Sequence, residues 1–99
     1  MNYTLKSEGD TVVASFDGRI DYSTVGTLED AIRVITEIDP GAIVFDFARV
    51  PAMDSVGLGL LLSLHETFAG KPITLCNTQP LVAHLLDLTS ARSLFTVTE

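Results

Sequence analysis

The chain is poor in cysteine, in basic residues and in long apolar runs. Cys76 is the only cysteine among 99 residues, so no disulfide forms within the chain, and we expect a small buried side chain there. Six lysines and arginines face 13 aspartates and glutamates, which gives a formal net charge of −7. This charge disfavours nucleic acid and anionic membrane surfaces as partners. It either suits a partner with a basic face or simply keeps a small protein soluble.

No apolar run is long enough to cross a membrane. The longest one, Leu58 to Leu64, covers about two helical turns and includes Gly59 and Ser63, whereas a crossing helix needs roughly 20 residues. The first residues alternate polar and apolar side chains and do not follow the pattern of a signal peptide. We therefore expect a mature cytoplasmic protein in which residues 1–99 form one domain.

Motifs of the common enzyme chemistries are also missing. His65 and His84 lack metal-ligand spacing to each other, to Cys76 or to a carboxylate pair. No Gly-x-Ser-x-Gly motif surrounds Ser55, no histidine base lies near it in sequence, and no glycine-rich phosphate loop carries a lysine. We expect neither enzyme activity nor a metal or cofactor.

Hydrophobic periodicity and turn residues predict an α/β fold. The expected elements are two strands within 1–17, a helix over 23–38 capped by Ser23 or Thr24, a strand over 42–47, a helix over 56–68, a strand over 73–76, a helix over 81–88, and a final strand or ordered tail over 94–97. Two strands followed by β/α alternation indicate a mixed sheet of about four to five strands with helices packed against it. The run over 42–47 is almost continuously apolar, which predicts a strand covered on both faces.

The junction between that strand and the next helix is the strongest candidate site. Asp54 and Ser55 stand where the helix starts, and a helix N-terminus stabilises an anion such as a phosphate on Ser55. Gly57 and Gly59 weaken the first turn, and they leave room for another surface to approach the backbone. Two plainer interpretations stay open, namely that Asp54 or Ser55 is only a helix cap and that the glycines serve internal packing.

Two stretches of the sequence resemble the signatures of a known family. The first is Phe16-Asp17-Gly18-Arg19-Ile20-Asp21 with Ser23-Thr24 downstream, and the second is Val44-Phe45-Asp46-Phe47 followed by Met53-Asp54-Ser55-Val56-Gly57-Leu58-Gly59. Over essentially its whole length the chain is similar to the anti-sigma factor antagonists, the prototype of the STAS domain. The resemblance implies a single, stand-alone STAS domain.

The resemblance also implies a mechanism. Ser55 matches the serine that is phosphorylated by an anti-sigma factor with GHKL-type serine kinase activity. The unphosphorylated antagonist binds that factor and frees the sigma factor, and a PP2C-type phosphatase reverses the phosphorylation. The implied partner surface consists of Asp21, Asp54, Ser55, Val56, Gly57, Leu58 and Gly59. Many members carry serine or threonine at the position of Val56, so Ser55 is the single hydroxyl of this corner.

Two other functions remain as alternatives. The chain could be a STAS docking subunit of another complex, in transport or lipid trafficking, without a phosphorylation switch. It could also be a small enzyme or nucleotide binder that uses the anion-friendly Asp54-Ser55 corner. For Asp21, helix capping ahead of Ser23 competes with a role at the partner surface.

Overall fold

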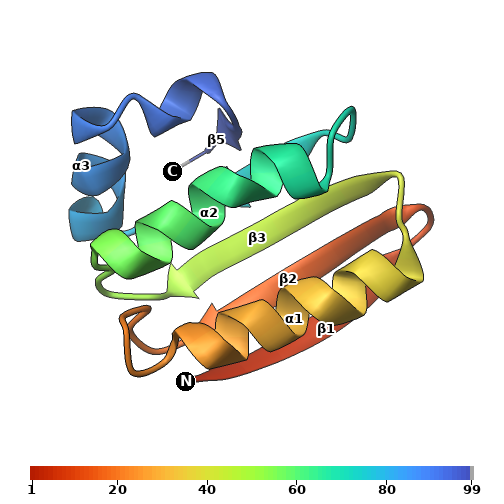
Figure 1. Cartoon of the computed structure of the whole chain (residues 1–99), viewed down its shortest axis with the longest axis horizontal. Coiled ribbons are helices and arrows are strands. Elements are labelled where there is room, and N and C mark those ends of the chain that lie inside the picture. Colours follow the sequence, from red (N-terminus) through yellow and green to blue (C-terminus); the bar gives the residue numbers. More distant parts are fainter. Residues whose placement is uncertain (99) are drawn as a thin grey trace.

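Five strands lie side by side in the order in which they occur along the described chain (Figure 1). The computed structural model describes residues 1–98. Its elements are β1 (Asn2–Glu8), β2 (Thr11–Asp17), α1 (Val25–Ile38), β3 (Ala42–Arg49), α2 (Ser55–Thr67), β4 (Ile73–Cys76), α3 (Pro80–Leu88), a short 3-10 turn η1 (Ala91–Ser93) and β5 (Thr96–Val97). β1 pairs antiparallel with β2, and all later pairs are parallel. The predicted α/β fold with a mixed five-stranded sheet is confirmed.

The helices lie on one face of the sheet. Each strand–helix–strand connection steps in the same direction along the strand order, and right-handed crossovers then place every helix on the same side. Figure 1 shows α1 and α2 in front of the strands. The core between the layers contains the aromatic rings of Phe16, Phe45 and Phe47, whose centroids lie 5.8–6.3 Å apart. Burial of these rings and of the aliphatic side chains around them stabilises the two-layer arrangement.

The prediction that strand 42–47 is covered on both faces is wrong. Burial alternates along β3, where Ile43, Phe45 and Phe47 are buried and Val44 and Asp46 are partly exposed. The larger apolar side chains point to the helices, and the smaller ones and the aspartate point to the other face. β3 therefore has one covered and one uncovered face, although nearly all of its residues are apolar.

Helix boundaries differ from the predicted ones by one or two residues. α1 begins at Val25 with Thr24 as its N-cap, and the Thr24 hydroxyl makes no capping hydrogen bond to the helix. That hydroxyl donates instead to the Arg19 carbonyl at 2.8 Å, so the residues before the helix form a separate turn. The segment 94–97 contains the short strand β5, and the 3-10 turn before it carried no clear signal in the sequence.

Parallel strands bring three loops to one edge of the sheet. β2, β3 and β4 run in the same direction, so the segments 18–24, 50–54 and 77–79 follow their carboxyl ends at the same edge. We call this edge, with the first turns of the helices that follow, the carboxyl edge. Ile20 and Met53 form a parallel bridge that joins two of the loops. In α/β sheets such loops are the usual place for function.

Within residues 1–98, no helix combines the length and the apolar character needed to span a membrane.

Candidate functional site

Asp54 connects two loops of the carboxyl edge through its two carboxylate oxygens. Oδ1 accepts hydrogen bonds from the backbone N–H groups of Val56 and Gly57, both at 3.0 Å, which makes Asp54 the N-cap of α2. Oδ2 accepts from the backbone N–H of Tyr22 at 3.1 Å, 32 residues away. Asp54 N–H in turn donates to the Ile20 carbonyl at 3.0 Å. One aspartate therefore fixes the start of α2 and the loop before α1 to each other.

Ser55 is the first residue of α2 and is exposed. The interpretation of Ser55 as the helix cap is wrong, because Asp54 fills that role. Within residues 1–98 the Ser55 hydroxyl has no hydrogen-bond partner among the bonds described. An exposed hydroxyl at a helix N-terminus is open to modification, and the positive end of the α2 dipole favours an anion there.

The two glycines of the first turn of α2 have different surroundings. A Cβ atom added at Gly57 would lie 2.5 Å from Ile20 Cγ2 and 3.1 Å from the Ile20 carbonyl oxygen. A Cβ atom at Gly59 would meet no atom within 4 Å. Gly57 thus lets loop 18–24 pack against α2, and Gly59 leaves an open patch of backbone on the exposed side. Leu58 is only 6% exposed and belongs to the core. Gly57 and Leu58 are therefore buried residues that support the exposed positions of the carboxyl edge.

The loop that contains Asp21 is held by side-chain hydrogen bonds. Asp21 Oδ1 accepts from the Ser23 N–H at 3.0 Å and from the Ser23 hydroxyl at 2.6 Å, while Asp21 N–H donates to Thr24 Oγ1 at 2.9 Å. The Ser23 hydroxyl bond, helped by the Ser23 N–H, Thr24 and nearby Arg19, lowers the pKa of Asp21 below its ordinary value. Asp21 therefore organises the turn before α1 without capping the helix, and it lies one residue from Tyr22, which Asp54 holds.

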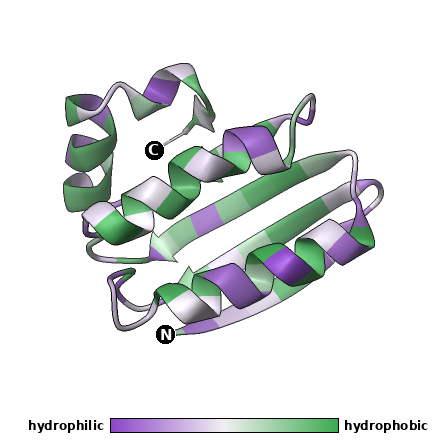
Figure 2. Cartoon of the chain, in the orientation of Figure 1, coloured by the Kyte–Doolittle hydropathy of each residue, from purple (hydrophilic) through white to green (hydrophobic). Residues whose placement is uncertain are grey.

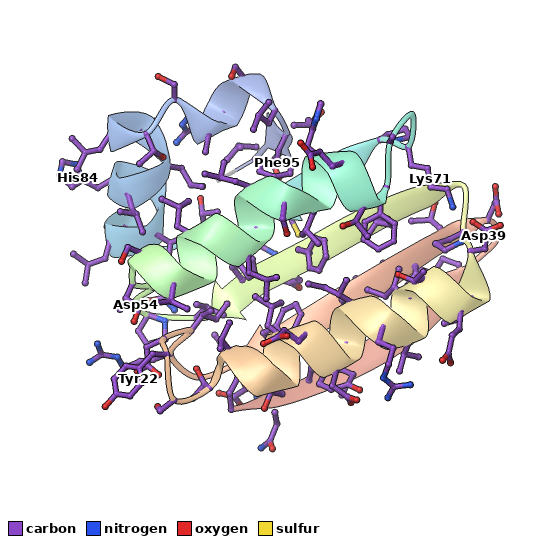
Figure 3. The ribbon with its side chains drawn as sticks, in the orientation of Figure 1. Tyr22, Asp39, Asp54, Lys71, His84 and Phe95 are labelled. Carbon is purple, nitrogen blue, oxygen red and sulfur yellow. The ribbon has the colours of Figure 1, made fainter. Side chains whose placement is uncertain are left out.

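Large apolar side chains remain exposed at this edge. Tyr22 is 78% exposed and Val56 is 47% exposed, and Leu81 at the start of α3 is also exposed. Figure 3 shows Tyr22 beside Asp54, with its ring directed away from the body of the protein. The sequence pattern assigned Val56 to the candidate surface and gave no signal for Leu81. The position of Tyr22 beside Asp21 was the one hint that it belongs there.

Charges at the carboxyl edge are acidic in sum. The loops 18–24, 50–54 and 77–79 and the first helical turns after them contain two aspartates and one arginine, a formal charge of −1. Arg19 lies 3.8 Å from Asp21, and Arg49 lies 3.6 Å from Asp17. Both arginines are solvent-exposed, so these pairs contribute little to stability. Such an edge favours a partner that carries positive charge.

Other polar groups lie away from Ser55. Asp46, on the uncovered face, accepts from the Ala48 N–H at 3.0 Å and from Asn77 Nδ2 at 3.1 Å, so it closes the end of β3. Cys76 is half-buried rather than fully buried, and burial, with the Asp46 charge nearby, raises the pKa of its thiol. A hollow of about 360 Å³ on this face is lined by residues that include Ser15 and Asp46 and not Ser55.

The fold and the architecture of this edge define a family. The STAS domain model matches residues 2–99, and the chain belongs to the STAS domain family. The chain is 35% identical over 63 residues to the anti-sigma-F factor antagonist RsfB of Mycobacterium tuberculosis, a match that covers 64% of this chain and 52% of that protein. The chain thus spans about half the length of the curated relatives that it matches first.

Solved structures agree with the family assignment. The crystal structure of an anti-sigma factor antagonist from Mycobacterium paratuberculosis superimposes with a TM-score of 0.91 at 26% identity, covering 98% of this chain and 84% of that one. The phosphorylated form of the Bacillus cell fate determinant SpoIIAA gives a TM-score of 0.73 at 20% identity, covering 99% and 92% of the two chains. The latter likeness concerns the fold. The predicted family and fold are thereby confirmed.

Proposed function

We propose that the chain is an anti-sigma factor antagonist whose binding is controlled by phosphorylation of Ser55. In its unphosphorylated form it binds an anti-sigma factor with GHKL-type serine kinase activity, and the sigma factor is released. Phosphorylation of Ser55 by that kinase ends the binding, and a PP2C-type phosphatase restores it. The observation that carries this proposal is the exposed Ser55 hydroxyl at the first position of α2, which has no hydrogen-bond partner within residues 1–98, in a chain of the STAS family.

The relatives support the antagonist role. RsfB and the M. paratuberculosis protein are named anti-sigma factor antagonists, and SpoIIAA has been solved in a phosphorylated form. The acidic carboxyl edge is consistent with a partner that has a basic surface. The surface we assign to this partner comprises Asp21, Asp54, Ser55, Val56 and Gly59 as exposed or half-exposed contacts, with Gly57 and Leu58 supporting them.

The electrostatic effect of the phosphate explains how the switch would act. A phosphate adds about −1.5 to −2 charges at neutral pH, and the N-terminus of α2 accommodates them within the fold. A partner surface fitted to the bare hydroxyl and to the open backbone at Gly59 would meet a bulky dianion beside Asp54. A loss of about 3–4 kcal/mol in binding free energy corresponds to a few hundredfold in affinity.

Phosphorylation and binding assays test this function directly. The chain is incubated with ATP and each GHKL-type kinase of its source organism, and the adduct of about 80 Da is mapped by mass spectrometry. We expect the adduct on Ser55. In titration calorimetry, Ser55→Ala should bind the kinase as tightly as the wild type, whereas Ser55→Asp should lose most of the affinity.

Ser63→Asp is the matched control. Ser63 is another exposed serine of α2, two turns further along, where its hydroxyl donates to the Leu60 carbonyl. The added charge at position 63 should leave binding within about threefold of the wild type, because it lies outside the first turn. An adduct at another residue, or equal losses for the two aspartate variants, would contradict the proposal. Co-purification with a membrane complex and indifference to Ser55→Asp would instead favour the docking-subunit alternative.

A further inference from the structure

Six large apolar side chains are exposed in the described part of the chain, and half of them lie at the carboxyl edge. They are Tyr22, Ile38, Val56, Leu81, Leu88 and Leu94. Tyr22 is the most exposed of the six at 78%, and it stands in the loop that Asp54 fixes to the start of α2. When a partner buries a large exposed ring, the apolar area removed from water makes the free energy of binding more favourable.

The backbone on both sides of Tyr22 is already ordered in the free protein. Its own N–H donates to Asp54 Oδ2 at 3.1 Å, and the preceding Asp21 N–H donates to Thr24 Oγ1 at 2.9 Å. After it, the Ser23 N–H donates to Asp21 Oδ1 at 3.0 Å. A partner that buries the ring therefore does not have to order this loop, and a tyrosine side chain has few torsions to restrict. These are the properties of an interface hot spot, where tyrosine is enriched.

The two tyrosines of the chain have contrasting environments. The Tyr3 hydroxyl donates to Asp30 Oδ2 at 2.6 Å, and its ring lies against the core beside Phe16 with centroids 6.2 Å apart. Tyr22 has no aromatic neighbour among the ring contacts of residues 1–98, and its ring points away from the protein in Figure 3. Tyr3 is thus a structural residue, whereas the fold does not use the ring of Tyr22.

We propose that Tyr22 is the anchor by which the carboxyl edge docks its protein partner. This inference rests on the proposed function and adds to it the chemistry of the partner surface. The partner presents an apolar socket for the Tyr22 ring, next to the surface that meets Ser55 and Val56. Basic groups line the rim of the socket, because the edge around Tyr22 carries a formal charge of −1, with Asp21 and Asp54 on either side of the Tyr22 backbone.

Substitutions of Tyr22 test the anchor, with the anti-sigma kinase that binds the wild-type chain as the probe. Tyr22→Ala should weaken binding by at least about 30-fold, as expected for a hot-spot truncation. Tyr22→Phe should stay within about threefold of the wild type, because the ring and not the hydroxyl fills the socket. Urea unfolding should give the same midpoint for all three proteins, since the side chain is exposed. At low and high salt the factor lost on Tyr22→Ala should be the same, because the ring carries no charge.

Ile38→Ala is the matched control at the opposite edge. Ile38 ends α1 and is 46% exposed, so its truncation removes a comparable exposed apolar group away from the carboxyl edge. Its binding should equal that of the wild type. If Tyr22→Ala binds like the wild type while Ser55→Asp does not bind, the anchor is refuted and the proposed function stands. A wild-type chain that binds none of the kinases would refute both, and an equal loss for Ile38→Ala or Tyr22→Phe would refute the anchor.

Discussion

The two edges of the parallel sheet are built in different ways. At the edge opposite the carboxyl edge, the turns use left-handed backbone, at Gly9 with φ 62°, Asp39 with φ 55° and Gly70 with φ 82°. There Gly41 N–H donates to the Asp10 carbonyl at 2.8 Å, and Lys71 pairs with Asp39. Figure 3 shows this pair at one end of the molecule and Tyr22 with Asp54 at the other.

The carboxyl edge also has left-handed backbone, at Gly18 with φ 117° and Asn77 with φ 56°, but side chains hold its loops as well. Its loops are held by the carboxylates of Asp21 and Asp54 and by the hydroxyl of Thr24, which bond to backbone groups. This construction permits longer loops that present a ring and a free hydroxyl to solvent while staying ordered. The difference teaches that the charged and hydroxylated residues of the carboxyl edge have a double role. They hold the loops, and they surround the candidate phosphorylation site.

The exposed faces of α1 and α2 also differ in their content of charged residues. Figure 2 shows the outer side of α1 in purple, whereas α2 is pale or green until its last turns. On α1, Arg33 pairs with Asp30 at 2.6 Å and with Glu37 at 3.3 Å. On α2 the first charged or basic residue is His65, and the preceding exposed positions are Ser55, Val56, Gly59 and Ser63. α1 has an ordinary solvated face, whereas the first turns of α2, with Ser55, Val56 and Gly59 exposed, have the weakly polar character expected of an interface.

The largest stability effect is expected at Gly57. The Cβ of Gly57→Ala would collide with Ile20, so the loop of the carboxyl edge must move. We expect a loss of about 1–3 kcal/mol in the free energy of unfolding, measured with urea. The control is Gly59→Ala, which meets no atom within 4 Å and should stabilise the helix by up to about 1 kcal/mol. Equal effects of the two substitutions would remove the structural distinction between these glycines.

Substitution of Asp54 separates the cap from the loop contact. Asp54→Ala removes both and should destabilise the fold by about 1–2 kcal/mol, close to the loss of a good N-cap. Asp54→Asn keeps an oxygen for Val56 and Gly57 and places an amide group opposite the Tyr22 N–H, where two donors meet. Asn should therefore restore most of the stability, while amide hydrogen exchange at Tyr22 becomes faster. Unchanged exchange at Tyr22 would mean that Oδ2 does not hold the loop.

A change at the opposite edge should affect stability and leave binding intact. Gly70 has φ 82°, so Gly70→Ala strains the backbone and should cost about 1 kcal/mol in the free energy of unfolding. The affinity for the anti-sigma kinase should stay at the wild-type value, measured by titration calorimetry on the folded variant. Weaker binding by Gly70→Ala would show that the functional surface extends beyond the carboxyl edge.

The smallest effect concerns Tyr3, the structural tyrosine. Its hydrogen bond to Asp30, together with burial and the Asp30 charge, raises the pKa of Tyr3 above the ordinary value of 10.0. A raised folded-state pKa stabilises the protein below pH 10 and the benefit is lost as the pH rises through that pKa. Absorbance titration of Tyr22→Phe isolates Tyr3, and adding Asp30→Asn should lower its pKa toward 10. An unchanged titration would mean that Asp30 does not determine the shift.

The alternation of strands and helices could be predicted from local pattern, and the loop contacts could not. The turns at Gly9 and Pro40 and the apolar spacing within each element define the elements. The Asp54-Ser55 corner was visible for the same reason, because it stands between a strand and a helix. The collision that requires glycine at position 57 involves Ile20, and no pattern within either segment reveals it.

Strand β3 shows that a run of apolar residues does not by itself predict burial on both faces. Ala42 and Val44 read as core residues in sequence, yet they alternate with Ile43, Phe45 and Phe47 and lie on the uncovered face. The difference in side-chain size, larger inside and smaller outside, was the available cue. For Tyr22, the position of the loop depends on a hydrogen bond from its backbone N–H to Asp54 across 32 residues, which becomes apparent only in three dimensions.

The shared carboxylate of Asp54 has a consequence for how this protein can change by mutation. Its two oxygens serve backbone groups from segments 32 residues apart, so position 54 is constrained by both segments at once. A substitution there loses the acceptor for α2, the acceptor for the loop or both, and even asparagine keeps only one of them. Ser55 and Val56 bear no such double constraint. The recognition chemistry beside Asp54 is therefore freer to diverge than the aspartate that supports it.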